Sequence, residues 1–341
     1  MYDLTVIGDG IAANLFLIEY LKKSPQKVLQ IHAEDKALPC TQNTTGTIFL
    51  KGVEMGRSPL GDLIYRSYHE AASFFKQHNP PGINSATLFY VCDGKKDTKA
   101  EFIRRFETVE PIDNFAPTPH RPSKQEWGKT WDGFVLNSTP FREYLDKTKR
   151  DLGQGNLEIK EDLLVGVQNG SDHISLKLLN GEVITTKKLV LCTGAYTKLY
   201  QKIYPEIPVI ANSKIIPGSY LETENVDLGE STFVLARSGH NLIYHSEYKR
   251  LIIGATHQLG ELQAPDYANL QAAHQNFSDL LDVQLPPIST FSVKSGLRHR
   301  GVKKLPFWGR VEGEIYGIFS LYRNGLTFPF LAARELSESI L

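Results

Sequence analysis

Cysteine is scarce in this chain of 341 residues, and long apolar runs are missing. Cys40, Cys92 and Cys192 lie far apart and form no CxxC pair, so neither a zinc site nor a disulfide scaffold is predicted. No stretch of about 18 apolar residues could span a bilayer. The apolar stretch 4–21 is interrupted by polar residues and follows no basic segment, unlike a signal peptide. We therefore expect a cytoplasmic protein without a membrane span.

The chain also lacks a net charge. Lys and Arg together number 38, as do Asp and Glu, which argues against a broad nucleic-acid surface, although a local basic patch is compatible with it. No HExxH or GxSxG pattern is present, so no metalloprotease or serine-hydrolase chemistry is predicted. The length suits two interlocked domains. The oligomeric state is not predicted by any pattern.

The first 35 residues predict a dinucleotide-binding turn. Residues 4–7 form a short apolar run that ends at Gly8, Gly10 and Ala13, which are spaced as in the GxGxx(G/A) pattern. Apolar residues at helical spacing follow, and they predict one buried stripe: Ile11, Leu15, Ile18 and Leu21. A second strand is expected at 28–31. This strand–helix–strand order favours a nucleotide site over a plain turn that needs glycines.

Each small residue of the turn has a physical role. Gly8 permits the tight turn, Gly10 lets a pyrophosphate approach the backbone, and Ala13 lets the helix pack closely on the strand. The helix start offers N–H groups to the phosphates. One element of the pattern is missing, because His32 stands where an acidic residue normally holds the ribose. Glu34 is our candidate for that role, with a solvated surface carboxylate as the alternative.

Three strand-like stretches in the middle of the chain predict a β-meander. They cover 163–167, 174–179 and 183–191, and Asn-Gly pairs separate them, a strong hairpin signal. The third stretch leads into Thr193-Gly194-Ala195. Small residues there would let the chain pass close to a cofactor.

Taken in order, these motifs resemble those of the D-amino-acid oxidase superfamily, and of glycine oxidases in particular. The matching C-terminal segments are Gly254-Ala255-Thr256, Gly296-Leu297-Arg298, Leu305-Pro306-Phe307-Trp308-Gly309 and Arg323-Asn324-Gly325-Leu326. The chain is also similar to the oxidase domain of the bifunctional tRNA wobble-uridine-modifying enzyme, with which it shares the run Ala33-Glu34-Asp35.

The resemblance implies an α/β fold. A Rossmann-like FAD-binding domain with a β-meander would be joined to a mixed-sheet (α+β) substrate domain. We expect a discontinuous FAD-binding domain made of 1–55, 141–205 and 296–341. Residues 56–140 and 206–295 would form the substrate domain, with 110–129 as an ordered loop or crossover.

The resemblance also implies an activity. An amine or amino acid such as glycine, a D-amino acid or sarcosine would pass a hydride to FAD and become an imine. The electron acceptor would be oxygen or, in a dehydrogenase, another carrier. A tRNA-modifying oxidase of methylaminomethyl groups and a nucleotide-binding module without catalysis are the alternatives. FAD would be non-covalent, because no cysteine follows Cys192.

Several residues acquire roles from the resemblance. Arg298 would pair with the substrate carboxylate, since a guanidinium matches it with two parallel hydrogen bonds; a structural ion pair is the alternative. Arg323 precedes the last helix, expected at 330–341, and Asn324 and Gly325 would offer N–H groups to the flavin. The remaining cofactor candidates are Thr44, Thr45, Gly46, Val165, Thr193, Gly194 and Leu326.

Several positions at which this sequence differs from glycine oxidases bear on which substrate would bind. Leu242 stands where those enzymes carry an active-site tyrosine, and Tyr244 could replace it because it shares the same strand face. His257 replaces a methionine and either lines the pocket or lies in a surface turn. Lys303-Lys304 replaces the usual aspartate. These changes predict a substrate that is larger or more acidic than glycine.

Overall fold

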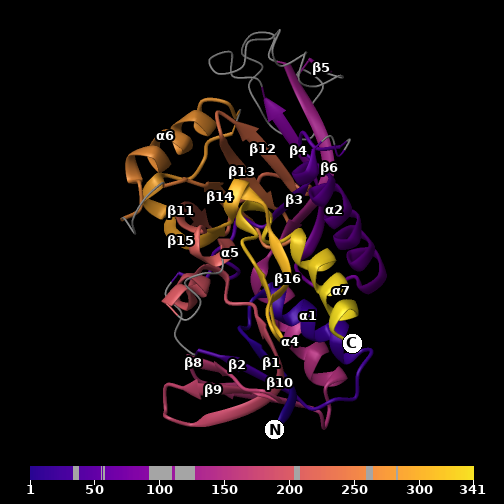
Figure 1. The fold of residues 1–341 in the computed structure, drawn as a ribbon. Coiled ribbons are helices and arrows are strands. Elements are labelled where there is room, and N and C mark those ends of the chain that lie inside the picture. Colours follow the sequence, from indigo (N-terminus) through magenta and orange to yellow (C-terminus); the bar gives the residue numbers. More distant parts are fainter. Residues whose placement is uncertain are drawn as a thin grey trace.

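Two β-sheets organise the protein, one below the other in Figure 1. The structure, a computed structural model, describes residues 1–33, 38–54, 56, 58–91, 110–111, 127–202, 208–258, 264–281 and 283–341. Within these residues, eight strands form the first sheet and nine form the second. None of the helices in this part of the chain is long and apolar enough to cross a membrane.

The first sheet confirms the predicted nucleotide-binding topology. Its order is β16-β17-β10-β1-β2-β7, and β9 pairs with both β10 and β8. The strands are β1 (Tyr2–Ile7), β2 (Val28–His32), β7 (Leu157–Glu161), β8 (Leu164–Asn169), β9 (Ile174–Leu178), β10 (Val183–Leu191), β16 (Phe307–Glu312) and β17 (Ile315–Phe319). Neighbours from β17 to β7 run parallel. The antiparallel β8–β9–β10 unit is the expected meander.

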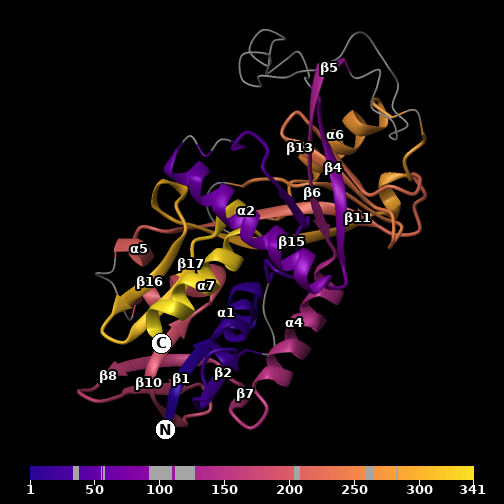
Figure 2. The same cartoon turned by 90° about the vertical axis from the view of Figure 1, so that its right-hand side faces the viewer.

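Helix α1 (Ile11–Leu21) is more deeply buried than its sequence suggests. One apolar stripe was expected, but every residue except Glu19 is buried. The reason is that α1 lies between α4 (Ser138–Leu152) and α7 (Phe328–Ile340), as Figure 2 shows. A helix that is covered on all sides has no solvent face to keep polar. Helix α2 (Pro59–His78) packs on α7 and extends this layer.

The second sheet has the order β15-β11-β14-β13-β12-β4-β6-β3, with β5 paired to β6. Its strands are β3 (Thr47–Phe49), β4 (Ile83–Val91), β5 (Glu110–Pro111), β6 (Trp127–Leu136), β11 (Lys214–Thr223), β12 (Phe233–Arg237), β13 (His240–His245), β14 (Arg250–Gly254) and β15 (Ser292–Arg300). Helix α6 (Tyr267–Ser278) packs on one face through Leu270, Ala273 and Phe277. The remaining elements of the described residues are a short helix, α5 (Pro208–Ala211), and four 3-10 segments, η2 (Gly194–Lys202), η3 (Ile288–Thr290), η4 (Val302–Lys304) and η5 (Tyr322–Asn324).

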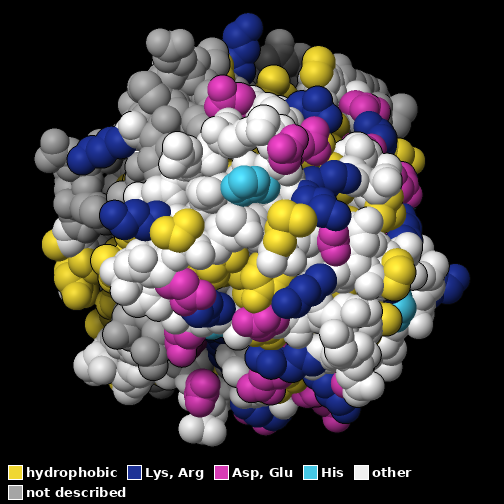
Figure 3. Space-filling view, turned by 60° about the horizontal axis from the view of Figure 1, so that its bottom comes forward, with side chains coloured by type: hydrophobic (Ala, Val, Ile, Leu, Met, Phe, Trp, Pro, Cys, Tyr) yellow, Lys and Arg dark blue, Asp and Glu magenta, His cyan; other side chains and the backbone are white. Residues whose placement is uncertain are grey.

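Near the expected domain boundaries, two segments that the sequence assigned to the FAD-binding domain pair in the second sheet. Strand β3 lies within 1–55, and the end of β15 lies within 296–341, yet both strands pair in the second sheet. The domain limits therefore stay a prediction. Most of the loop expected at 110–129 lies outside the described residues. On the face seen in Figure 3, basic and acidic side chains are interspersed, as a zero net charge leads one to expect.

Candidate active site

Two adjoining cavities run from the edge of the first sheet to the space between the sheets. The inner cavity has a volume of about 420 Å³ and is lined by residues of both sheets. The outer cavity, of about 530 Å³, lies beyond the carboxyl ends of β1, β2 and β10, the edge where parallel sheets bind nucleotides. Gly10, Cys40, Thr41 and Gly194 line both cavities. The arrangement suits one long, extended ligand.

The glycine-rich turn forms a cradle between the two cavities. Gly8 has a φ of +118°, and a Cβ there would lie 2.5 Å from the carbonyl oxygen of Cys192. Gly10 begins α1 without a side-chain cap, and Thr41 Oγ1 lies 3.5 Å from the Ile11 nitrogen. Apart from this bond from the Ile11 N–H to Thr41, the first turn of α1 has no side-chain cap, and it opens into the lined space, which fits the pyrophosphate of a dinucleotide. Ala13 is fully buried beneath the turn.

A buried lysine supports this turn from below. Lys149 on α4 is only 2% exposed. Its Nζ donates to Asn14 Oδ1 at 2.8 Å, and it lies 2.7 Å from the carboxylate of Asp146. Asn14 Nδ2 in turn donates to the carbonyl oxygen of Asp9, between the two glycines, at 2.9 Å. The sequence alone does not single out Lys149, because its burial depends on how α4 packs against α1.

The outer cavity gathers most of the cofactor residues expected at the sheet edge. His32, Val165, Thr193 and Gly194 line it, and they come from the ends of β2 and β10 and from β8. Glu34, our candidate for the ribose, lies outside the described residues.

The loop before β3 lies against the inner cavity. Thr44 and Thr45 line it, as expected for residues beside a flavin ring. Gly46 does not line it. With a φ of +71° and no room for a Cβ beside the Leu136 carbonyl oxygen, Gly46 instead shapes the loop, and its N–H donates to Thr44 Oγ1 at 3.2 Å.

The turn before α7 also faces the inner cavity. Arg323, Asn324, Gly325 and Leu326 line it, and Thr327 starts α7 without a side-chain cap. One expectation needs correction. The N–H of Asn324 donates to the carbonyl oxygen of Leu321 at 3.0 Å, so it is used within the turn, and the contact of the Gly325 N–H with a flavin stays a prediction.

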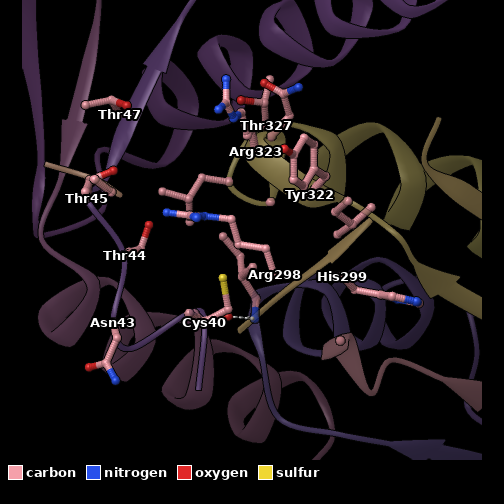
Figure 4. A pocket seen from close by; sticks show the side chains of 18 of the residues that line it. Cys40, Asn43, Thr44, Thr45, Thr47, Arg298, His299, Tyr322, Arg323 and Thr327 are labelled. Atoms are coloured by element: carbon pink, nitrogen blue, oxygen red, sulfur yellow. Dashed lines mark hydrogen bonds between the residues drawn. The ribbon is translucent and has the colours of Figure 1, made fainter. Parts of the chain in front are cut away.

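Arg298 occupies the middle of the inner cavity. Figure 4 shows its guanidinium group extending between Thr45 and Tyr322. Its Nη1 donates to the carbonyl oxygen of Thr256 at 3.2 Å, and Arg298 forms no ion pair with any residue that the structure describes. Burial lowers the pKa of Arg298 from its ordinary value, but a guanidinium stays charged in proteins. An unpaired, partly buried cation is therefore available for an anionic ligand.

Two glycines make room for this arginine. Gly218 on β11 lies against the guanidinium, and a Cβ there would collide with it. Gly296 lets the loop carrying Cys40 approach β15, and a Cβ would lie 2.9 Å from the carbonyl oxygen of Asn43. Asn43 Nδ2 then donates to the Ser295 carbonyl oxygen at 2.7 Å and joins this loop to β15. Glycines inside strands often mark such close approaches. Gly218 and Gly296 were therefore the signal in the sequence that could have indicated this close packing.

The neighbours of Arg298 were not predicted. The Cys40 thiol lies beside the guanidinium in Figure 4; burial raises its pKa, and the charge of Arg298 opposes that rise. His299, the next residue on β15, turns away from Arg298 in the same view because side chains alternate along a strand. Its Nδ1 accepts the Ser320 N–H at 3.1 Å, and burial lowers its pKa to about 4.

His257 lines the inner cavity rather than lying in a surface turn. Its Nε2 is 3.0 Å from the hydroxyl oxygen of Tyr322, a residue that the sequence did not point to. Burial, followed by the positive charges of Arg323 and Arg298, lowers the pKa of His257. These effects favour the neutral imidazole in the absence of a bound anion.

The proposed role of Tyr244 is wrong. Its side chain is fully buried, it belongs to the core beneath α6, and its hydroxyl donates to the Gly229 carbonyl oxygen at 3.1 Å. Leu242 is in the same core, so the two residues do share a strand face, but that face is turned away from the cavity. Asn241, on the opposite face of β13, lines the cavity instead.

We expect a bound flavin to leave the protein on acid denaturation. No cysteine follows Cys192, whose thiol is buried and has a pKa raised to about 12 by that burial, which disfavours the reactive thiolate. The measurement is the flavin absorbance of the supernatant and pellet after acid precipitation of the yellow protein. Flavin that stays with the pellet would contradict a non-covalent site.

Comparison with known proteins agrees with this architecture. The family model described as FAD dependent oxidoreductase (DAO) matches residues 3–339. No curated protein sequence matches the chain. Among solved structures, glycine oxidase from Geobacillus kaustophilus is 15% identical, with a TM-score of 0.78 over 99% of this chain and 95% of that one. Iminodiacetate oxidase from Chelativorans sp. BNC1 is 14% identical, with a TM-score of 0.74 over 98% and 94%. L-proline dehydrogenase from P. horikoshii is 14% identical, with a TM-score of 0.78 over 99% and 93%.

Proposed function

Because this chain belongs to the DAO family of FAD-dependent oxidoreductases, we propose that it oxidises the C–N bond of an amine that also carries a carboxylate. The resemblance to this family and the fold class expected from the sequence are confirmed. One observation carries the proposal: the Arg298 guanidinium lies in the inner cavity without an ion-pair partner among the described residues. The solved structures similar to this chain are named for glycine, iminodiacetate and L-proline, which are all amino carboxylates.

The roles of the residues follow from their positions. Arg298 would bind the substrate carboxylate, and its contact with the Thr256 carbonyl oxygen would orient it. The cradle at Gly8 and Gly10 would hold the pyrophosphate, and the start of α7 would lie at the flavin end. FAD, when bound, supplies the two-electron oxidation: the α-carbon gives up a hydride, the nitrogen becomes an imine, and water then hydrolyses the imine.

The charge of the cavity favours the reactive form of the amine. Lys51, Arg298 and Arg323 line the inner cavity, whereas no Asp or Glu among the described residues does. Surrounding positive charge lowers the pKa of an ammonium group. The amine therefore binds in its neutral form, whose lone pair assists loss of the hydride, and no dedicated general base is needed inside the cavity.

Anaerobic reduction of the flavin tests this function. Under nitrogen, we expect amino carboxylates to bleach the flavin absorbance of the purified holoenzyme at a rate that rises with their concentration. Admission of air to the reduced enzyme then distinguishes an oxidase, whose absorbance returns at once, from a dehydrogenase that needs a carrier. A panel of primary, secondary and cyclic amino carboxylates that leaves the flavin oxidised would refute the proposal.

A further inference from the structure

A cluster of positive groups surrounds Tyr322 at one side of the inner cavity. The Tyr322 ring and the His257 ring meet edge to face, with centroids 5.7 Å apart. The guanidinium carbons of Arg300 and Arg323 lie 5.9 and 5.7 Å from the centroid of the Tyr322 ring. Arg300 stands two residues after Arg298 on β15 and therefore lies on the same strand face.

The described residues do not neutralise this cluster. Arg298, Arg300 and Arg323 form no ion pair with any of them, whereas Arg250, Arg310 and Arg334 pair with Glu222, Glu314 and Glu70. Arg298 and Arg300 are partly buried and Arg323 is exposed, and like charges held this close repel one another unless a counter-ion arrives. A carboxylate on Arg298 would supply one negative charge and leave Arg323 and Arg300 unbalanced.

We propose that the substrate carries a second anionic group in addition to its α-carboxylate, and that His257, Tyr322 and Arg323, with Arg300 behind them, bind this group. The inference rests on the proposed amine oxidation and adds the substrate class, an amine with two anionic groups such as an amino dicarboxylate. The second group could equally be a phosphonate, because the recognising groups are a hydroxyl, an imidazole and guanidinium ions.

The proposal predicts a dependence on pH. The positive groups that face His257 come from β15, η4 and η5, and they are Arg298, Arg300, Lys304 and Arg323. They lower the pKa of the free imidazole, together with burial. A bound anion offsets the positive charges and thereby raises that pKa, so a dianion takes up a proton as it binds. The affinity for a dianion should therefore rise more steeply than that for a monoanion as the pH falls through the range in which the imidazole takes up a proton.

Binding of ligands that cannot be oxidised separates this subsite from turnover. Diglycolate carries two carboxylates around an ether oxygen, and methoxyacetate retains only one of them. Titration of the holoenzyme, followed by the perturbation of the flavin spectrum, gives both dissociation constants. We expect diglycolate to bind roughly 10- to 100-fold more tightly, the effect of one additional charge-assisted contact. The kcat/KM for flavin reduction should be higher for iminodiacetate than for its monoamide by a similar factor.

Two variants and one control locate the effect. Arg300→Gln should lower the preference for diglycolate measurably, although Arg300 does not itself line the cavity, and His257→Gln should abolish its dependence on pH. Arg310→Gln removes an exposed arginine that pairs with Glu314 outside both cavities, and it should leave the preference unchanged.

The outcomes distinguish the subsite from the proposed function. Equal affinities for the two ligands, or an unchanged preference in Arg300→Gln, would overturn the subsite. Reduction of the flavin by monocarboxylate amines would still uphold amine oxidation in that case. (Phosphonomethoxy)acetate replaces one carboxylate of diglycolate by a phosphonate, and tighter binding of it than of diglycolate would assign the second group to a phosphonate. Failure of every anion to bind would overturn both the subsite and the role of Arg298.

Discussion

Replacement of Arg298 by alanine should lower kcat/KM for a carboxylated amine by roughly 30- to several-thousand-fold. Loss of one partner of a buried charge pair costs about 2–5 kcal/mol, and about 1.4 kcal/mol corresponds to a tenfold change in rate. The side chain lies in the inner cavity and has no carboxylate partner within the described part of the chain, so its removal affects the substrate rather than a structural ion pair. The rate of anaerobic flavin reduction at several substrate concentrations measures the effect.

Two further variants test whether geometry, and not charge alone, matters at this position. Arg298→Lys should recover little activity, because an ammonium group cannot form the two parallel hydrogen bonds. Gly218→Ala keeps Arg298 but places a methyl group where the guanidinium lies, so it should displace the side chain and reproduce much of the loss. Flavin content should stay at the wild-type level in all three variants.

A decarboxylated amine is the control for the Arg298 series. Its rate should be low in the wild-type enzyme and change little in Arg298→Ala, because it lacks the group that Arg298 binds. If both substrates lose activity by the same factor, Arg298 has a structural role, and the carboxylate assignment of the cavity is wrong.

Replacement of Gly10 by glutamate should strongly weaken FAD binding. Gly10 has a φ of −67°, and a Cβ would meet only Thr41 Oγ1 at 3.3 Å, so the backbone accepts a side chain. A carboxylate there would face the pyrophosphate, and like charges brought together cost several kcal/mol. A loss of about 3 kcal/mol of binding free energy would raise the dissociation constant for FAD by roughly 100-fold. The ratio of flavin to protein absorbance after purification and reconstitution measures it.

Matched substitutions separate charge from bulk at the same turn. Gly10→Gln has nearly the same size as Gly10→Glu and should retain more flavin, and Gly10→Ala should retain the most. Gly8→Ala is a poor substitute for this test, because its positive φ and its contact with Cys192 would disturb the fold itself. Full flavin occupancy in well-folded Gly10→Glu would mean that the pyrophosphate lies elsewhere.

The local elements of the nucleotide-binding half could be predicted because short-range rules determine them. The turn at Gly8 and Gly10 lies between β1 and α1 as expected, and the Asn-Gly pairs mark the meander of β8, β9 and β10. Glycine preferences and apolar periodicity act over a few residues. The same rules could not show that α1 is covered on all sides, because that depends on α4 and α7, which are distant in sequence.

The strand face of Tyr244 shows a second limit of sequence reasoning. Alternation along a strand tells which residues share a face, and Leu242 and Tyr244 do share one. It does not tell which of the two faces meets the cavity. Helix α6 determines the orientation, because it packs on the face of Tyr244, and the face of Asn241 therefore lines the inner cavity.

By itself, the sequence determined the dinucleotide turn, the meander, the family and the candidate role of Arg298, since each depends on residues that are close together or on a recognisable order of motifs. Only the tertiary structure decided what surrounds that arginine. Gly218, Thr256 and Tyr322 come from separate strands and turns, and no local pattern relates them. Packing of the two sheets brings them to one cavity and leaves Arg298 and Arg323 without an ion-pair partner among the described residues, because pairing between distant strands, rather than local preference, positions these side chains.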